Sequence, residues 1–478
     1  MRFAMGLGLA LLGASSCSLT TADVGACASS QECRVAFGVG AVCEADGYCR
    51  TEALPPRCEL RLPEGASADP TLLADTVPIA TVVDLSLDSH AARANSVELA
   101  LVDASRLGVE GRGFSLVVCT NQDDFQGDGL DRSAASLSLG TYLEDIGTRV
   151  VVGPPASSDA EAVFGVTEDV LFINPSATSN ALTGLDPSPA TDTMPGRFWR
   201  TAAPDEQQGI RIAEDVRSRD VATLAIVHAN DPYGTGLRDV VVAVLAAGEE
   251  DVEVIDFPFE NGDDTSFGVA VASAASTPTD EVLFVSSQTE EAVAFATSAA
   301  TLPGFAGRSL FLTDSAGNED FAAEVRTDTQ ARQTCGRIRG TRPAVAVGFV
   351  TDLFRSLYQS AEGEDPTLFG FASNSYDAGW LAAISVAWGV LQEDGDLSWP
   401  ALARGLRNVS AGTEVNLDAG GFATVLSAFA RGESVNVTGA SGTLDYDVST
   451  EETMAPTELW VIDDDCDLVV LPDPDGDP

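Results

Sequence analysis

The chain has 478 residues, 45% of them hydrophobic, and carries 73 acidic against 26 basic residues, for a formal net charge of -47. This length predicts two or three domains, and so negative a field disfavours nucleic acid and anionic lipid as partners. Every basic residue is arginine, which excludes lysine-dependent phosphate loops and Schiff bases, and His90 and His228 are too few for a histidine-rich zinc site. No cofactor and no metal are expected.

The N-terminus has the features of an export signal. Arg2 precedes an apolar run of about ten residues, Phe3 to Leu12, which has signal-peptide length and is too short to span a bilayer. Small residues then lead into Cys17, a pattern that resembles a bacterial lipoprotein signal, in which residues 1–16 are removed and the cysteine is acylated. That pattern prefers leucine where this chain has Ala14, and the alternative is ordinary cleavage with Cys17 in a disulfide. We expect a cell-envelope protein, periplasmic or on the outer membrane, held to the membrane by its lipid only.

The cysteine count agrees with export. Without Cys17 eight cysteines remain, an even number that suits an oxidising compartment. Four of them fall within Cys27 to Cys49, a segment too short to bury a core, so two disulfides are expected to hold it. Zinc is the alternative, but the spacings lack a C-x-x-C pair. Residues 17–72 are therefore predicted to form a lipidated, cysteine-rich neck that ends in a linker rich in proline and polar residues at 51–72.

Beyond residue 72, short β-branched runs alternate with longer alanine-rich amphipathic stretches, a pattern typical of βαβ units and a parallel sheet. The strands that this pattern predicts are Pro78–Val83, Ser115–Cys119, Arg149–Val152, Val170–Ile173, Thr223–His228, Glu253–Phe257, Glu281–Val285 and Ser309–Thr313. Predicted helices include Glu206–Arg217, Leu237–Ala247, Thr289–Ala300 and the long apolar segment Ser375–Gln392, which suits a buried helix. Leu459 to Leu471 reads as a final strand pair before an acidic tail at 471–478. Such an alternation divides naturally into two doubly wound lobes.

Three strand-to-helix turns are rich in small hydroxyl residues. They begin at Val152, Ile173 and His228 and read VGPPASS, INPSATSN and HANDPYG. Hydroxyls and free N–H groups at a helix start can hold a carboxylate without a charged side chain. Helix capping is the alternative explanation for each turn taken alone, because serine and threonine are common caps.

Taken together and in order, the segments VVVGPPASSDA, VLFINPSATSNALT, FWRTAAPDEQQG, LAIVHANDPYGTGL, SYDAGWLAA and GASGTLDYD resemble the leucine/isoleucine/valine-binding family of type I periplasmic binding proteins. The resemblance covers roughly Thr76 to Val470. It implies an α/β fold with two Rossmann-like lobes joined by a hinge of three crossings, here preceded by the disulfide-rich neck. Lobe 1 is expected to span residues 73–200 and 342–443, and lobe 2 residues 201–341 and 444–470.

The same resemblance implies a ligand site between the lobes. By motif, Ser157 and Ser158 match serines that hold an α-carboxylate, and Thr178 matches a threonine that binds carboxylate and ammonium. The carbonyl of Ser176 matches an ammonium acceptor, and Tyr233 an aromatic contact. The chain departs from the family at three places, which involve the positions Asp314, Ser315 and Gln288 and the segment DLSLDSHAARAN. The acidic residue that binds the ammonium group in the family aligns near Ser315, so Asp314 would have to replace it. The segment SSQ, which ends at Gln288, stands where the family has an aromatic residue. The segment DLSLDSHAARAN stands where the family has a glycine-rich loop. The pocket should therefore be more polar than one shaped for leucine.

The family fold also bears on the four cysteines outside the neck, for which spacing alone leaves three pairings open. Cys58 and Cys119 would lie in the first lobe, and Cys335 and Cys466 in the second. A bridge between lobes would resist closure. The resemblance therefore implies the pairs Cys58–Cys119 and Cys335–Cys466.

These observations predict a solute-binding lipoprotein that traps a small, amino-acid-like ligand for an ABC importer. The alternative is a ligand-sensing surface receptor of the same fold, because Ser18 after the lipidated cysteine usually permits sorting to the outer membrane. An enzyme is the third hypothesis, and the sequence offers no catalytic constellation for it. Calcium binding at NQDDFQGDGLD or at the acidic tail does not fit EF-hand spacing, and a solvated acidic loop is expected instead.

Overall fold

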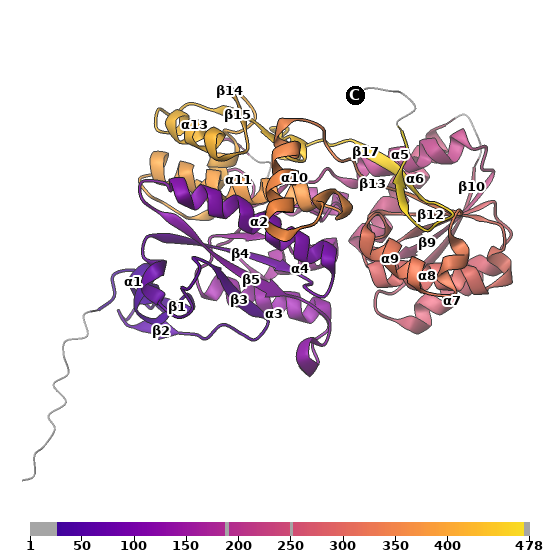
Figure 1. Cartoon of the computed structure of the whole chain (residues 1–478), viewed down its shortest axis with the longest axis horizontal. Coiled ribbons are helices and arrows are strands. Elements are labelled where there is room, and N and C mark those ends of the chain that lie inside the picture. Colours follow the sequence, from indigo (N-terminus) through magenta and orange to yellow (C-terminus); the bar gives the residue numbers. More distant parts are fainter. Residues whose placement is uncertain (1–25, 187–190, 249–251, 473–478) are drawn as a thin grey trace, which may run out of the picture.

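The computed structural model describes residues 26–186, 191–248 and 252–472, which form two lobes, each built around a β-sheet (Figure 1). The first sheet is parallel except for its edge strand β3, in the order β3 (Cys58–Leu62), β5 (Gly113–Thr120), β4 (Thr76–Val83), β6 (Val150–Val152), β7 (Leu171–Asn174) and β8 (Phe198–Arg200). The second sheet is antiparallel only at its last two strands, in the order β10 (Glu253–Phe259), β9 (Thr223–Ala229), β11 (Glu281–Val285), β12 (Ser309–Leu312), β13 (Ile338–Pro343), β17 (Thr457–Ile462) and β18 (Leu468–Val470).

Helices cover both sheets. Those of the first lobe are α2 (Asp88–Leu107), α3 (Arg132–Asp145), α4 (Ser157–Val166), α10 (Phe349–Glu362), α11 (Ala372–Gln392), α12 (Trp399–Leu406) and α13 (Ala419–Phe429). A small sheet of β14 (Thr413–Asn416), β15 (Val435–Gly439) and β16 (Gly442–Thr443) lies beside them. The second lobe has α5 (Asp205–Ser218), α6 (Pro232–Ala247), α7 (Asp264–Ser276), α8 (Thr289–Thr301) and α9 (Glu319–Thr327).

The pattern of apolar residues explains these sheets. Strand β4 is buried at every position, as expected for a central parallel strand with helices on both faces. All eight strands that the alternation predicts are present, as are the helices predicted around α5, α6 and α8. The predicted final strand pair is β17 and β18, although Leu471, assigned to the acidic tail, still bonds through its N–H to the carbonyl of Leu459 at 2.8 Å.

The long apolar segment that begins at Ser375 forms α11, a helix buried in the core of the first lobe. It packs against α2 so closely that a Cβ on Gly379 would lie 3.0 Å from the carbonyl oxygen of Val97. Glycine is therefore needed for this approach of the two helices. Within the described residues, no helix combines the length and the apolar character that crossing a bilayer requires.

The chain passes between the lobes three times, after β8, after β13 and after β16. Two expected boundaries are wrong in detail. The segment read as a linker contains β3, which pairs with β5 in the first sheet, so it belongs to the first lobe. Leu444 and Tyr446, expected in the second lobe, lie in the hydrophobic core of the first, because the third crossing begins after them.

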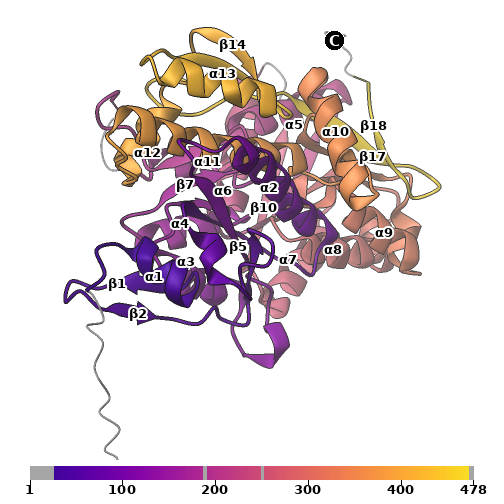
Figure 2. The same cartoon turned by 60° about the vertical axis from the view of Figure 1, so that its left-hand side comes forward.

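The neck packs on the first lobe on the side away from the second lobe (Figures 1 and 2). It consists of α1 (Ser30–Phe37), β1 (Ala41–Cys43) and β2 (Cys49–Thr51), held by the disulfides Cys27–Cys43 and Cys33–Cys49. The expected disulfide-rich neck is confirmed. Cys27, Cys33 and Cys43 lie close enough together to suggest a metal site, but their sulfur atoms are used in these disulfides. The signal peptide and Cys17 lie outside the described residues.

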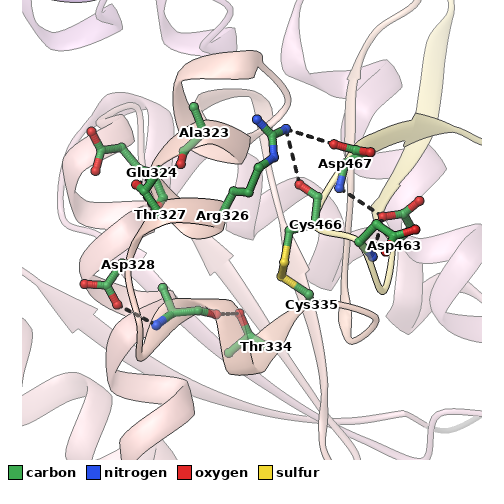
Figure 3. The surroundings of a disulfide bond; sticks show 12 residues. Ala323, Glu324, Arg326, Thr327, Asp328, Thr334, Cys335, Asp463, Cys466 and Asp467 are labelled. Carbon is green, nitrogen blue, oxygen red and sulfur yellow. Dashed lines mark hydrogen bonds and ion pairs between the residues drawn. A yellow bond between two sulfur atoms is a disulfide. The ribbon is translucent and has the colours of Figure 1, made fainter.

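Both long-range disulfides lie within a lobe. Cys58 and Cys119 are directly paired across β3 and β5, with Cα atoms 4.0 Å apart. Cys335 and Cys466 have Cα atoms 5.2 Å apart, and Arg326 bonds to Asp467 at 3.0 Å beside them (Figure 3). The structure thus forms both pairs that the resemblance implies and leaves the three crossings free of a disulfide between lobes.

Candidate functional site

A pocket lies between the lobes, at the carboxyl ends of β6 and β7 on one side and of β9 and β12 on the other. In open α/β sheets this is where ligands bind. The pocket holds about 590 Å³ of empty space, part of it open to solvent. We call it the interlobe pocket, and its lining residues are His90, Arg93, Asn121, Arg132, Pro155, Ala156, Ser157, Asp159, Ser176, Thr178, Tyr233, Ser287, Gln288, Thr289, Asp314, Ser315, Asn318 and Phe371.

The structure brings seven of the eight proposed ligand contacts into this pocket and leaves Ser158 out. Ser157 and Ser158 are the first two residues of α4, and consecutive helical side chains point about 100° apart. Ser157 is buried and its hydroxyl accepts a hydrogen bond from the N–H of Ser179 at 3.2 Å. The turn named by the motif thus lies at the pocket, but only one of its two serines lines it.

The second turn is shaped by Asn174, which the motif did not single out. Its side-chain oxygen accepts from the N–H groups of Ser176 and Ala177, at 3.0 and 2.8 Å, and its amide donates to Pro154 at 2.8 Å. An asparagine that binds its own backbone two residues on forms an Asx turn. This turn fixes Ser176 and Thr178, both nearly buried, toward the pocket.

The wall from the second lobe contains Asp314, in the short 3-10 helix after β12. Burial raises the pKa of its carboxyl well above the usual range, and the nearby Asp205 carboxylate raises it further. Gln208 donates a hydrogen bond to Asp314. Its neighbour Ser315 lines the pocket and accepts, through its carbonyl, from the hydroxyl of Thr289 at 2.8 Å.

Tyr233 and Gln288 complete the proposed contacts from the second lobe. Tyr233, at the start of α6, is 3% exposed, and burial raises the pKa of its hydroxyl well above the usual value. Gln288 stands at the start of α8 and is positioned by a 2.9 Å hydrogen bond from its N–H to the hydroxyl of Ser286. The two side chains come from different helices and meet only in the fold.

Asp205 is a further acidic residue near the pocket that sequence reasoning missed. It begins α5 directly after the first crossing and is fully buried. Burial raises the pKa of Asp205 to about 7, while Thr178 and Arg200 lower it. Its N–H donates to the carbonyl of Thr178 at 2.9 Å, so it lies immediately behind a proposed ligand contact. The position of this acid between AAP and EQQ gave no sign of its burial.

Direct hydrogen bonds and an ion pair join the lobes around the pocket, so the cleft is closed in this structure. Ser179 donates to the carbonyl of Pro232 at 2.7 Å, and the N–H of Ser89 donates to Asp320 at 2.9 Å. Arg132 of the first lobe reaches Glu290 of the second at 3.2 Å. A closed cleft excludes bulk water, which strengthens the electrostatic interactions inside it.

The loop NQDDFQGDGLD has a structural explanation. Asp128 pairs with Arg57 at 2.7 Å, and Asp124 accepts from the N–H of Gly129 at 2.9 Å. Within the described ranges, the only three-residue cluster of potential metal ligands is that of the neck cysteines. The loop is thus held by an arginine and by its own backbone.

No protein-family model matches the chain. Among curated proteins it is similar to the chemotactic signal transduction system substrate-binding protein BasB of Halobacterium salinarum, with 24% identity over 328 residues, 67% of this chain and 71% of the relative.

Among solved structures it is similar to the substrate-binding protein LivJ of Streptococcus pneumoniae in complex with isoleucine (TM-score 0.59, 17% identity, 83% of this chain and 99% of the other). It is also similar to the leucine-binding protein LivK of Thermotoga maritima (0.61, 15%, 84% and 99%). A third match is a solute-binding protein from R. palustris in complex with benzoate (0.58, 16%, 83% and 95%). The chain therefore has the type I periplasmic binding protein fold, as its motifs predicted.

Proposed function

We propose that this chain is an extracytoplasmic solute-binding lipoprotein that traps a small, amino-acid-like ligand between its lobes and delivers it to an ABC importer. The observation that carries the proposal is the closed interlobe pocket, which sets hydroxyls and backbone N–H groups of the first lobe opposite the buried Asp314 of the second. A zwitterion needs this arrangement, because its carboxylate and ammonium must each meet an opposite partial or full charge away from water.

In this proposal the first lobe binds the α-carboxylate at Ser157, where helix α4 begins, and at Thr178, in the turn after β7. The N-cap residue Ala156 provides no side-chain cap, so the first N–H groups of α4 remain available to an anion. The ammonium group lies between the carbonyl of Ser176 and Asp314. Nothing in this scheme requires a catalytic group, a metal or a cofactor.

Native mass spectrometry of the protein as purified tests the function. We expect a retained small molecule that leaves on unfolding, and calorimetry of the freed protein should then identify binders among amino acids and aromatic acids. If none of them binds with a Kd below about 1 mM, the proposal is wrong.

The substitution Thr178→Ala should weaken binding of the best amino acid roughly tenfold or more, because a hydrogen bond to a charged group contributes about 1.5–3 kcal/mol. Ser158→Ala is the matched control, since Ser158 lies outside the pocket, and its Kd should stay within about twofold of the parent. Calorimetry on both variants checks this. A loss of affinity in Ser158→Ala but not in Thr178→Ala would mean that Ser158, and not Thr178, contacts the ligand.

Sensing without transport is the second candidate function, favoured by the similarity to the chemotactic signal transduction system substrate-binding protein of Halobacterium salinarum. The two functions share the same binding step and differ in the partner. Co-purification with a permease would support transport, whereas co-purification with a transducer would support sensing.

The lipid anchor is a separate proposal, which rests on the sequence around Cys17. The parent protein should fractionate with membranes, whereas Cys17→Ser should leave the exported protein soluble. Intact-mass analysis of the mature parent should show acyl chains on its first residue. An unmodified Cys17 would contradict the anchor.

A further inference from the structure

The interlobe pocket contains a buried cation that bonds directly to no carboxylate among the described residues, although Asp314 and Asp320 lie close enough to interact with its charge. Arg93 on α2 is 8% exposed and lines the pocket. Its partners are all neutral: Nε donates to the carbonyl of Gly370 at 3.1 Å, Nη1 donates to the hydroxyl of Ser176 at 3.3 Å, and the guanidinium lies 5.0 Å from the ring centroid of Phe371. Nη2 has no hydrogen-bond partner within the described part of the chain.

Buried arginines of this chain fall into two groups. Arg57, Arg200 and Arg342 each pair with a carboxylate. Arg34 and Arg197, like Arg93, bond to neutral groups, but neither lines the interlobe pocket. An unpaired charge removed from water is costly, so a buried arginine normally has an anionic partner. Burial lowers the pKa of Arg93 to about 10, which still leaves it charged at neutral pH. What sets Arg93 apart is its place in the interlobe pocket, where its guanidinium is positioned to pair with an anionic group of a ligand.

His90 lies one turn before Arg93 on the same helix face and lines the same pocket. Its Nδ1 accepts a hydrogen bond from the N–H of Asp84 at 3.2 Å, so Nδ1 carries no proton. Burial, together with Arg93 and Arg132, lowers the pKa of His90 well below its usual value. The ring is therefore neutral with its proton on Nε2, which makes it a hydrogen-bond donor.

The other cation of this wall already has carboxylate partners. Arg132 bonds to Asp84 at 2.6 Å as well as to Glu290, and its Nε is buried without a partner. Asp159 is the acid on this side; burial raises its pKa to about 6, and Asn121 donates to it at 3.4 Å. Of the two arginines in this wall, Arg93 is the one that bonds directly to no carboxylate.

We infer that the ligand carries a second anionic group, bound by Nη2 of Arg93 and Nε2 of His90, and that it is an α-amino acid with an acidic side chain. The inference rests on the proposed function, in which Ser157 and Thr178 already hold the α-carboxylate and Asp314 the ammonium. A dicarboxylic amino acid then places a carboxylate directly against Arg93 and His90. A neutral amino acid such as leucine would leave Arg93 without a directly bonded anion.

Calorimetry on the full mature chain, freed of retained ligand by dialysis, tests this with L-glutamate, L-aspartate, L-glutamine, L-asparagine, L-leucine and benzoate. We expect glutamate or aspartate to bind at least about 100-fold more tightly than its amide, because a site built for a charged partner rejects the analogue that lacks it. Arg93→Met should abolish this preference. Arg106→Met, on the same helix but 73% exposed, should preserve it.

The outcomes separate the inference from the proposed function. If glutamine or leucine binds as tightly as glutamate, the acidic ligand is wrong while amino acid binding stands. If only benzoate binds, the ammonium site and the acidic amino acid are both wrong. If nothing binds, the proposed function fails. The comparison of acids with amides in the parent protein needs no variant, so a folding defect in Arg93→Met would not leave the inference untested.

Discussion

Asp314→Asn should raise the Kd of the best-binding amino acid by at least about 30-fold, because removing one member of a buried, hydrogen-bonded charge pair costs about 2 kcal/mol or more. Asp314 is the acidic group of the pocket wall formed by the second lobe, and asparagine keeps its size and its bond to Gln208 while removing the negative charge. Calorimetry at pH 7.5 measures the change. Glu324→Gln, at an exposed acid on α9 outside the pocket lining, is the acidic control, and we expect less than a fivefold effect.

The same variant carries a pH signature. The pKa of Asp314 is raised by burial and by Asp205, so protonation, which weakens its attraction for an ammonium group, occurs at higher pH than for an ordinary carboxyl. Affinity of the parent, measured from pH 6 to pH 8, should therefore increase with pH. Tyr233, Gln208 and Arg93 also face this carboxyl but hold their charge state in that range. Asp205, with a pKa of about 7, remains in Asp314→Asn. The affinity of this variant should therefore depend on pH less steeply than that of the parent, but the dependence should not vanish. Equal slopes in parent and variant would contradict the role of Asp314.

Arg200→Met should lower the free energy of unfolding by about 3–5 kcal/mol, the cost of leaving one member of a buried ion pair alone. Arg200 ends β8, is fully buried, and pairs with Glu452 of the third crossing, which is 10% exposed. Its guanidinium also donates to the carbonyl of Ser179 at 2.9 Å and to the hydroxyl of Thr183 at 2.8 Å. The residue thus ties two crossings to the loop that carries Thr178.

Chemical denaturation followed by circular dichroism measures this effect. Arg431→Met is the matched control, because its ion pair with Glu433 is 55% exposed on both sides and such pairs contribute about 0–1 kcal/mol. A loss below about 1 kcal/mol in Arg200→Met would show that Glu452 finds another partner or water. We also expect weaker ligand binding in this variant, since the loop after β7 loses the three hydrogen bonds that Arg200 donates to Ala177, Ser179 and Thr183.

Local patterns along the sequence were enough to predict most of the scaffold. Runs such as TVPIATVV and EVLFV form central strands because helices bury both of their faces, and an apolar strand of this kind is recognisable wherever it occurs. Polar segments were harder to interpret. Strand β3 has the sequence CELRL, and it is a strand because the edge of β5 and the disulfide to Cys119 hold it there.

The turns at Ser157 and Thr178 were also predictable, because a strand, a small hydroxyl residue and a helix start follow one another directly in the chain. What tertiary structure alone decided is which charges share the pocket. Arg93 and Asp314 are separated by more than two hundred residues and come from different lobes. The shift in the pKa of either side chain cannot be predicted from its neighbours in the sequence. The serine that faces the pocket was settled by the rotation of α4, and the burial of Asp205 by the docking of α5. Charge, burial and direction depend on what the rest of the fold places around a residue, and that information is not local.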